Sequence, residues 1–339
     1  MTNVETESGA KVESPDVGRA RPTAIELAES YTLVLVTIGI VVFFSLLPAT
    51  RDLYLTPENI RTTLGNSAVL AVAAVAMIPP LTAGRYDLSI GAVLGFAAIA
   101  AAASMSTAGL GLPVAIGIAL AVGAVFGVIN GILTTVFRID SLISTLAMAT
   151  IIAGLVSFFT GGRAIASGID PWLIAFGGGN FLGIPSLIYV VAAVSIALWY
   201  VLTYTPFGRQ MQAIGVNEEA AQLVGIRVNR SVFYGFLISG VLAGVAGVML
   251  VARSGGITPT AGPLYSLPAF AAVFLGATSI KPGRFNVAGT LVAILFLAAM
   301  TSGLNLAGAQ DWVSSLVNGL ALLIGVGLTA ELTRRRRGA

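Results

Sequence analysis

The sequence predicts an all-α polytopic membrane protein. Hydrophobic residues make up 56% of the chain and charged residues only 10%, with a mean hydropathy of +0.93, whereas soluble domains carry about 25% charged residues. Ten apolar segments follow one another, and most are near the roughly 20 residues that a membrane-spanning helix needs. The chain has no Cys and no His, which excludes disulfides, thiol chemistry and histidine-based catalysis or metal binding.

Residues 1–22 mix charged residues with Pro and Gly and contain few large apolar side chains, so we expect a disordered cytosolic tail. The ten apolar segments then span residues 31–48, 60–81, 88–106, 112–136, 142–160, 184–204, 231–252, 262–277, 285–305 and 312–330. Segment 262–277 is short and contains Pro263 and Pro268, which favours a broken or re-entrant helix.

The positions of Lys and Arg predict the orientation. With the N-terminus inside, cytosolic segments hold 14 of the 18 basic residues and outer segments hold 4. Because Lys and Arg gather on the cytosolic side, ten spans with both termini in the cytosol are favoured. Residues 23–333 then form the membrane domain, and the basic tail 334–339 contacts anionic membrane lipid. The net charge of +3 is too small to indicate nucleic-acid binding.

The cytosolic loop 207–230 contains a predicted short helix with its own caps. Asn217 is a good N-cap, and Glu218 and Glu219 place negative charge at the positive end of the helix dipole. Gly225 is positioned to end the helix in the left-handed conformation.

The predicted helix has one apolar face, formed by Ala220, Leu223 and Val224. A helix of about two turns is not stable alone in water, so this face is expected to be covered. Two interpretations remain open from the spacing alone: docking against a cytosolic partner, or an interfacial helix lying on the protein's own spans.

Neutral polar side chains, rather than charges, are expected within the spans. Asp87 and Asp140 fall at predicted cytosolic edges, and the lack of a carboxylate at membrane depth argues against proton- or sodium-coupled transport. Amides and hydroxyls suit a neutral polyhydroxylated solute, although they also form interhelical hydrogen bonds in any bundle. The candidate residues for a translocation path are Asn66, Asn130, Ser144, Thr145, Thr150 and Ser157.

Two turns share a motif. The stretch Gly84-Arg85-Tyr86-Asp87-Leu88-Ser89 is similar to Gly283-Arg284-Phe285-Asn286-Val287-Ala288, and both precede a predicted span on the inner side. Transporters are often built from repeats, but chance similarity in apolar sequence remains an alternative. In the first copy, Asp87 and Ser89 are predicted to cap the third span at its cytosolic start. The adjacent prolines at 79 and 80 are expected to break the second span.

Four stretches carry a family resemblance: 82–91, with Asp87-Leu-Ser89; 130–131 followed by 138–146; 213–226; and 282–290 followed by 303–306. Each is weak alone, but the four in order resemble the membrane permeases of bacterial ABC-type monosaccharide importers of the ribose/xylose/arabinose/galactose type. The resemblance covers most of the chain after about residue 60. It implies a vitamin-B12-permease-like bundle, as in type II ABC importers.

The resemblance also implies partners. These are an ABC ATPase subunit that binds ATP and Mg, a periplasmic or lipid-anchored solute-binding protein, and a second permease copy in a homodimer or heterodimer. The chain itself would bind no cofactor. By resemblance, 215–226 is the coupling helix seated in a groove of the ATPase, with the residues Gly215, Asn217, Glu218, Glu219, Ala220, Ala221, Leu223, Val224 and Gly225.

One departure concerns the solute. Sugar permeases often have Gly-Gly-Ile before Asp-Leu-Ser, whereas this chain has Gly84-Arg85-Tyr86, which leaves a sugar alcohol or other polyol open. The expected function is therefore import of a neutral sugar or polyol across the bacterial inner membrane, without enzymatic activity. A stand-alone facilitator or secondary carrier is the alternative, and genes for an ATPase and a binding protein beside this one would discriminate. A membrane-embedded enzyme is disfavoured by the absence of His, Cys and intramembrane carboxylates.

Overall fold

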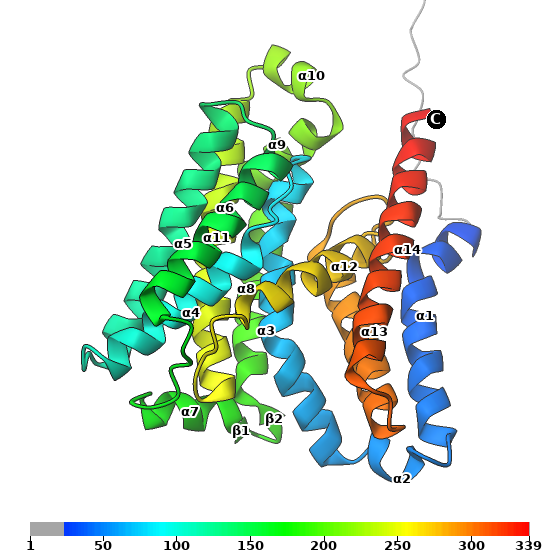
Figure 1. Ribbon diagram of the computed structural model, residues 1–339. Coiled ribbons are helices and arrows are strands. Elements are labelled where there is room, and N and C mark those ends of the chain that lie inside the picture. The colour runs from blue at the N-terminus through cyan, green and yellow to red at the C-terminus, as the bar shows by residue number, and fades with distance from the viewer. Residues whose placement is uncertain (1–23, 339) are drawn as a thin grey trace, which may run out of the picture.

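The computed structural model describes residues 24–338 as helices joined by short connections and one small hairpin (Figure 1). The helices are α1 (Ala24–Leu46), α2 (Arg51–Tyr54), α3 (Pro57–Thr82), α4 (Ile90–Ser106), α5 (Leu112–Thr135), α6 (Ser141–Thr160), α7 (Pro171–Gly178), α8 (Ser186–Tyr204), α9 (Pro206–Val216), α10 (Glu218–Leu223), α11 (Val228–Ser254), η1 (Gly262–Tyr265), α12 (Ser266–Gly276), α13 (Val287–Leu306) and α14 (Asp311–Gly338). The antiparallel hairpin pairs β1 (Asn180–Phe181) with β2 (Ile184–Pro185).

The ten predicted apolar segments all correspond to helices. In the described part of the chain, 7 helices are long and apolar enough to cross a membrane: α3, α5, α6, α8, α11, α13 and α14. The apolar stretches Ser30–Leu46, Ile90–Ser106 and Gly262–Gly276 are shorter. The prediction of an all-α polytopic membrane protein is therefore confirmed.

Helices α3 and α11 form the centre of the bundle. Their apolar windows are 78% and 67% buried inside the protein, against 17% to 39% for the other candidate spans. Glycines let α11 approach α5 closely, because a Cβ on Gly240 would lie 2.2 Å from the carbonyl oxygen of Gly123. In lipid there is no hydrophobic driving force between helices, so the close packing of small residues stabilises such crossings instead.

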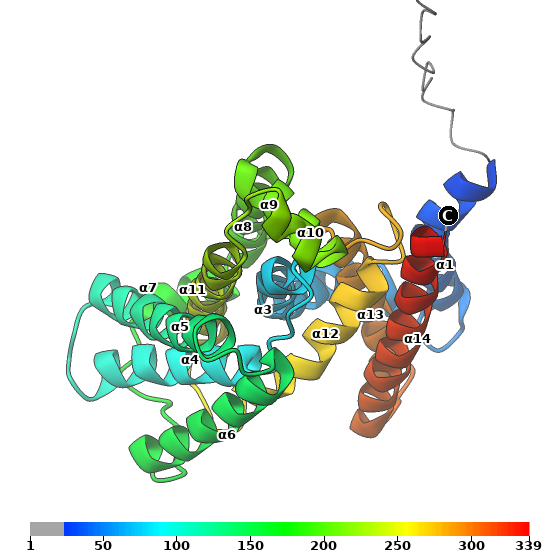
Figure 2. The ribbon, with the colours of Figure 1, turned by 90° about the horizontal axis from the view of Figure 1, so that it is seen from above.

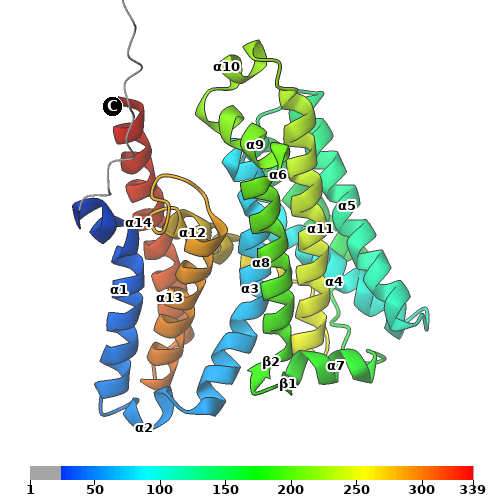
Figure 3. The same cartoon turned by 180° about the vertical axis from the view of Figure 1, so that it is seen from behind.

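Two groups of helices lie on either side of α3. Figure 2 and Figure 3 show α4, α5, α6, α8 and α11 in one group and α1, α13 and α14 in the other. Helix α3 packs against α11 in the first group and α13 in the second, and α12 packs against α3, α13 and α14. The polar turn before α4 thus lies in the first group and the similar turn before α13 lies in the second.

The structure corrects one prediction about helix breakers. Helix α3 runs through Pro79 and Pro80 to Thr82, and both prolines are buried among neighbouring helices, whose packing tolerates proline within a membrane helix. Gly177 lies in α7, where a Cβ would come within 2.0 Å of the carbonyl oxygen of Ala252. Close packing, rather than flexibility, explains that glycine.

Other boundaries also differ from the predictions. Segment 262–277 is divided into η1 and the 11-residue α12, as the prolines suggested. Helix α14 continues to Gly338, so the basic run 334–337 lies on the helix. Helix α9 was not predicted, although Pro206 at its first position is a recognised start signal. The predicted tail 1–22 lies outside the described residues.

Candidate functional site

Helix α10 projects beyond the other helices at one end of the bundle (Figure 1). The Asn217 side chain accepts a hydrogen bond from the Ala220 N–H at 3.0 Å, as an N-cap should. Gly225 follows the helix with a φ of +84°, and the Ile226 N–H donates to the Ala221 carbonyl. Together with the bond from the Gly225 N–H to Gln222, this makes a Schellman end, so both predicted caps are present.

The two faces of α10 differ in burial. Ala221 is buried against α9 and α11 in a cluster with Met211, Ile214 and Val232. On the other face, Leu223 is 89% exposed and Val224 is 77% exposed, beside the exposed Ala220. No described residue of the chain covers that apolar face, which disfavours the interpretation that it lies on the protein's own spans.

Helix α9 fixes the base of α10. Gly215 lies in the last turn of α9, where a Cβ would come within 2.0 Å of the Thr82 carbonyl oxygen at the end of α3. Any larger residue would separate the two helices. Gly215, which was expected at the start of the coupling helix, therefore lies in α9 and allows close backbone approach to α3.

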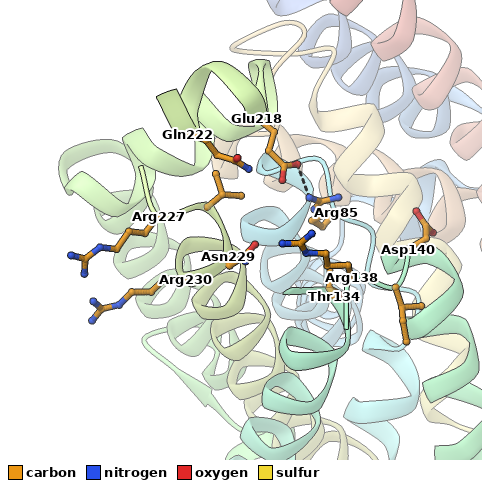
Figure 4. A pocket seen from close by; sticks show the side chains of 11 residues that line it. Arg85, Thr134, Arg138, Asp140, Glu218, Gln222, Arg227, Asn229 and Arg230 are labelled. Atoms are coloured by element: carbon orange, nitrogen blue, oxygen red, sulfur yellow. Dashed lines mark hydrogen bonds and ion pairs between the residues drawn. The ribbon is translucent and has the colours of Figure 1, made fainter. Parts of the chain in front are cut away.

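An ion pair joins α10 to the turn after α3. The Arg85 guanidinium lies 2.6 Å from a carboxylate oxygen of Glu218 (Figure 4). The side chains are 30% and 39% exposed. Glu219, the other acid in the first turn, makes no ion pair with a described residue. Arg85, the departure from the sugar-permease motif, thus contacts the predicted coupling helix.

Hydroxyl groups of α6 hold the segment that follows Arg85. The Tyr86 N–H donates to Ser141 Oγ and the Leu88 N–H donates to Thr145 Oγ1, each at 3.0 Å. These backbone donors have no helical partner because they lie between α3 and α4. Side chains of α6 thereby fix the path of residues 83–89.

A buried polar cluster lies at the end of this segment. The carboxylate of Asp87, 3% exposed, accepts hydrogen bonds from Ser89 Oγ at 2.6 Å and Ser239 Oγ at 3.2 Å. Asn130 donates its side-chain N–H to Ser89 Oγ at 2.8 Å, and its own side-chain oxygen has no partner among the described residues. We call Asp87, Ser89, Asn130 and Ser239 the polar cluster; it joins the start of α4 to α5 and α11.

The position of Asp87 corrects a prediction. Asp87 was expected at a cytosolic edge, but it contacts Ser239 near the middle of the 27-residue α11. The chain turns back into the bundle after α3 instead of remaining at its surface, so α4 starts inside. Ser89 occupies the N-cap position of α4, and Asp87 binds the Ser89 N–H at 3.0 Å.

A cavity of about 800 Å³ opens between α10 and the connection from α5 to α6. It is lined by Arg85, Thr134, Arg138, Ile139, Asp140, Glu218, Gln222, Arg227, Val228, Asn229 and Arg230. Figure 4 shows Arg227 and Arg230 pointing away from Arg85 and Arg138. The ion pair and the apolar cluster that contains Ala83 and Ala221 both connect α10 with the 83–89 segment.

The six candidate path residues are not brought together. Asn130 belongs to the polar cluster and Thr145 binds the segment that leads to it. Asn66 accepts a hydrogen bond from Arg253 in a separate, exposed pair. Ser144 is buried and donates to the Ser141 carbonyl, whereas Thr150 and Ser157 are exposed on α6.

Sequence reasoning missed Ser141 and Ser239, which complete the contacts around Asp87. Both are single serines at a span edge or within an apolar helix, and nothing in the local pattern distinguishes them from serines bonded to their own helix. In the described part of the chain, no group of three or more Asp and Glu side chains could hold a metal ion.

Comparison with known proteins identifies a matching family and several relatives. Residues 59–326 match the family described as the branched-chain amino acid transport system permease component. The chain is 33% identical to the ribose import permease protein of Escherichia coli K12 over 315 residues, 91% of this chain and 96% of that one. It is 36% identical to the ribose import permease protein of Bacillus subtilis over 290 residues, 85% and 90% of the two chains.

A third relative is the L-arabinose ABC transporter permease protein of Azospirillum brasilense, which is 33% identical over 306 residues, 89% of each chain. No solved structure matches. The matched region includes the polar cluster, α10 and the exposed apolar face of that helix. The chain therefore belongs to the branched-chain amino acid transport system permease component family, and it is a membrane permease rather than an enzyme.

Proposed function

We propose that this permease forms the membrane path of an ABC importer for a neutral monosaccharide or a related polyol. The observation that carries the proposal is α10: a helix with both caps formed whose apolar face is left uncovered by the described chain. The names of the relatives, ribose and arabinose permeases, support the solute class.

The proposed partner on α10 is an ABC ATPase. An exposed Leu–Val pair costs free energy in water, and burying it in a groove recovers roughly 1.5–3 kcal/mol for each fully buried side chain. ATP and Mg would bind the ATPase, whose closure would move α10 and re-orient the spans between outward and inward states. No residue of this chain would take part in ATP hydrolysis.

The solute would pass a path of amides and hydroxyls beside the buried carboxylate of Asp87. Asn130, which binds Ser89, and Thr145, which binds the adjacent Leu88, are the candidates, since amide and hydroxyl groups exchange hydrogen bonds with sugar hydroxyls. Arg85, which left the solute open at the sequence level, is bonded to α10 instead. The sequence Gly84-Arg85-Tyr86, which differs from the usual Gly-Gly-Ile, is therefore compatible with a sugar as the solute.

We further propose a second permease copy and a solute-binding protein on the outer face, in the bacterial inner membrane with both termini in the cytosol. The orientation rests on the 14 basic residues of the inner segments against 4 outside. A reporter that is active only outside the membrane, fused after Ala339, should stay silent; strong activity would overturn this orientation.

Reconstitution tests the proposal. Proteoliposomes containing the permease, the ATPase encoded beside it and the cognate binding protein should take up labelled ribose, arabinose or another neutral sugar only when ATP is present on the ATPase side. Omission of the ATPase should abolish accumulation. Uptake that persists without the ATPase would instead identify a facilitator or secondary carrier.

A further inference from the structure

Residues 83–89 connect α10 to the interior of the bundle. At the α10 end, Arg85 binds Glu218 through a 2.6 Å contact. At the interior end, Asp87 and Ser89 bind Asn130 of α5 and Ser239 of α11. One residue, Tyr86, therefore separates the ion pair from a cluster in which Asp87 is 3% and Ser89 is 0% exposed.

The backbone of this segment is short of helical hydrogen bonds and is held by its neighbours. Tyr86 and Leu88 donate to hydroxyls of α6. Gly84 adopts a φ of +73°, and the N–H groups of Gly84 and Arg85 donate to the carbonyls of Leu81 and Pro80, so the turn preceding Arg85 is a Schellman end of α3. Because only Tyr86 separates Arg85 from Asp87, a displacement of Arg85 shifts the backbone that positions the Asp87 carboxylate.

The ion pair is poorly suited to stabilising the fold. Both side chains are partly exposed, and such pairs contribute little to folding stability. The Arg85 Nε is buried without a partner among the described residues, so Glu218 contacts the guanidinium only through its terminal nitrogen Nη2. Its removal should leave the bundle folded and change how α10 is connected to it.

We propose that the Arg85–Glu218 pair is the positioning link that couples movement of α10 to the polar cluster at the start of α4. The inference rests on the proposed function, in which an ATPase moves α10. When α10 is displaced, Glu218 draws Arg85 with it, and the 83–89 segment alters the contacts of Asp87 with α5 and α11. Arg85 acts through Glu218 and does not touch the solute.

Charge reversal tests the link in the reconstituted importer. Glu218→Arg and Arg85→Glu should each lower sugar-stimulated ATPase activity and uptake at least about fivefold, the lower end of typical allosteric coupling. The double variant Arg85→Glu/Glu218→Arg restores an opposite-charge pair and should recover most of the loss. Recovery in the double variant distinguishes a lost ion pair from a lost docking contact, because the double variant still carries the Glu218→Arg change.

Arg138→Glu is the matched control. It makes the same charge reversal as Arg85→Glu in the same cavity, but Arg138 lies outside α10 and has no ion pair with a described residue. It should retain stimulation by sugar-loaded binding protein.

Three outcomes would overturn the link: normal coupling in Glu218→Arg, failure of the double variant to recover while its folding and abundance are normal, or equal loss in Arg138→Glu. A failure of the proposed function would look different, since the unaltered permease would then neither co-purify with the ATPase nor require it for uptake.

Discussion

The turn before α4 and the turn before α13 share a motif but differ in what surrounds them. Gly84 and Gly283 have φ values of +73° and +74°. The aromatic residues that follow two positions later, Tyr86 and Phe285, both pack on Phe274, with ring centroids at 6.4 Å and 5.2 Å. The similarity seen in the sequence thus extends to the backbone and to a shared neighbour.

The polar residue of each turn makes different bonds. Asn286 caps α13 by accepting from the Gly289 N–H at 2.7 Å, and its amide group donates to carbonyls within 10 residues. Asp87 instead reaches Ser239, which is 152 residues away in the chain. Arg284 is exposed and forms no ion pair with any residue in the described range, whereas Arg85 binds Glu218.

The motif therefore specifies a turn and a cap, and tertiary contacts add the connection to other helices. The turn before α13 bonds to α1 through Ser30 and to α12 through Gly276. The turn before α4 is tied to α5, α6, α10 and α11. We expect equivalent substitutions in the two turns to have unequal effects on transport.

The largest difference is expected between Asp87→Ala and Asn286→Ala. Loss of the Asp87 carboxylate removes the acceptor that joins Ser89 to Ser239, and uptake should fall roughly tenfold, within the range of allosteric coupling. Asn286→Ala loses an N-cap, which costs about 1 kcal/mol, and most transport should remain. Uptake by reconstituted protein of matched abundance, with thermal unfolding followed in parallel, measures both effects.

Equal losses of uptake in the two alanine variants, without a difference in unfolding temperature, would contradict the distinction between the turns. Asp87→Asn is the informative companion variant, because it keeps an oxygen acceptor of similar shape. It should retain more transport than Asp87→Ala.

The smallest difference is expected between Gly84→Ala and Gly283→Ala. Both positions require a left-handed backbone conformation, which costs a residue with a Cβ about 1 kcal/mol or slightly more. Denaturation in detergent should therefore show similar destabilisation by the two substitutions. A much larger effect at either glycine would show that the turns are not equivalent locally.

Local features of the structure could be predicted from the sequence, and tertiary ones could not. Asn217 and Gly225 were correctly assigned as caps because a cap depends on neighbours within a few residues. The depth of Asp87 was missed because it depends on Ser239, far along the chain. The continuity of α3 through Pro79 and Pro80 was missed because it depends on packing against neighbouring helices, which the local sequence does not show.

The path residues show the same limit. A hydroxyl in an apolar helix can bond to its own helix, as Thr150 does, or to another segment, as Thr145 does. The sequence pattern around the two is alike. Only the packing of α6 against residues 83–89 distinguishes the role of Thr145 from that of Thr150.

The measurement that most directly tests the central claim is the ATPase coupling of Leu223→Asp. Leu223 is 89% exposed on the uncovered face of α10, so the permease should fold and reach the membrane, but a carboxylate buried against the ATPase would cost several kcal/mol. We expect loss of ATPase co-purification and of sugar-stimulated hydrolysis and uptake. Gln222→Asp, which places the same charge on the cavity side of α10, should keep all three. Normal uptake by Leu223→Asp at normal abundance would contradict the assignment of α10 as the element that docks the ATPase.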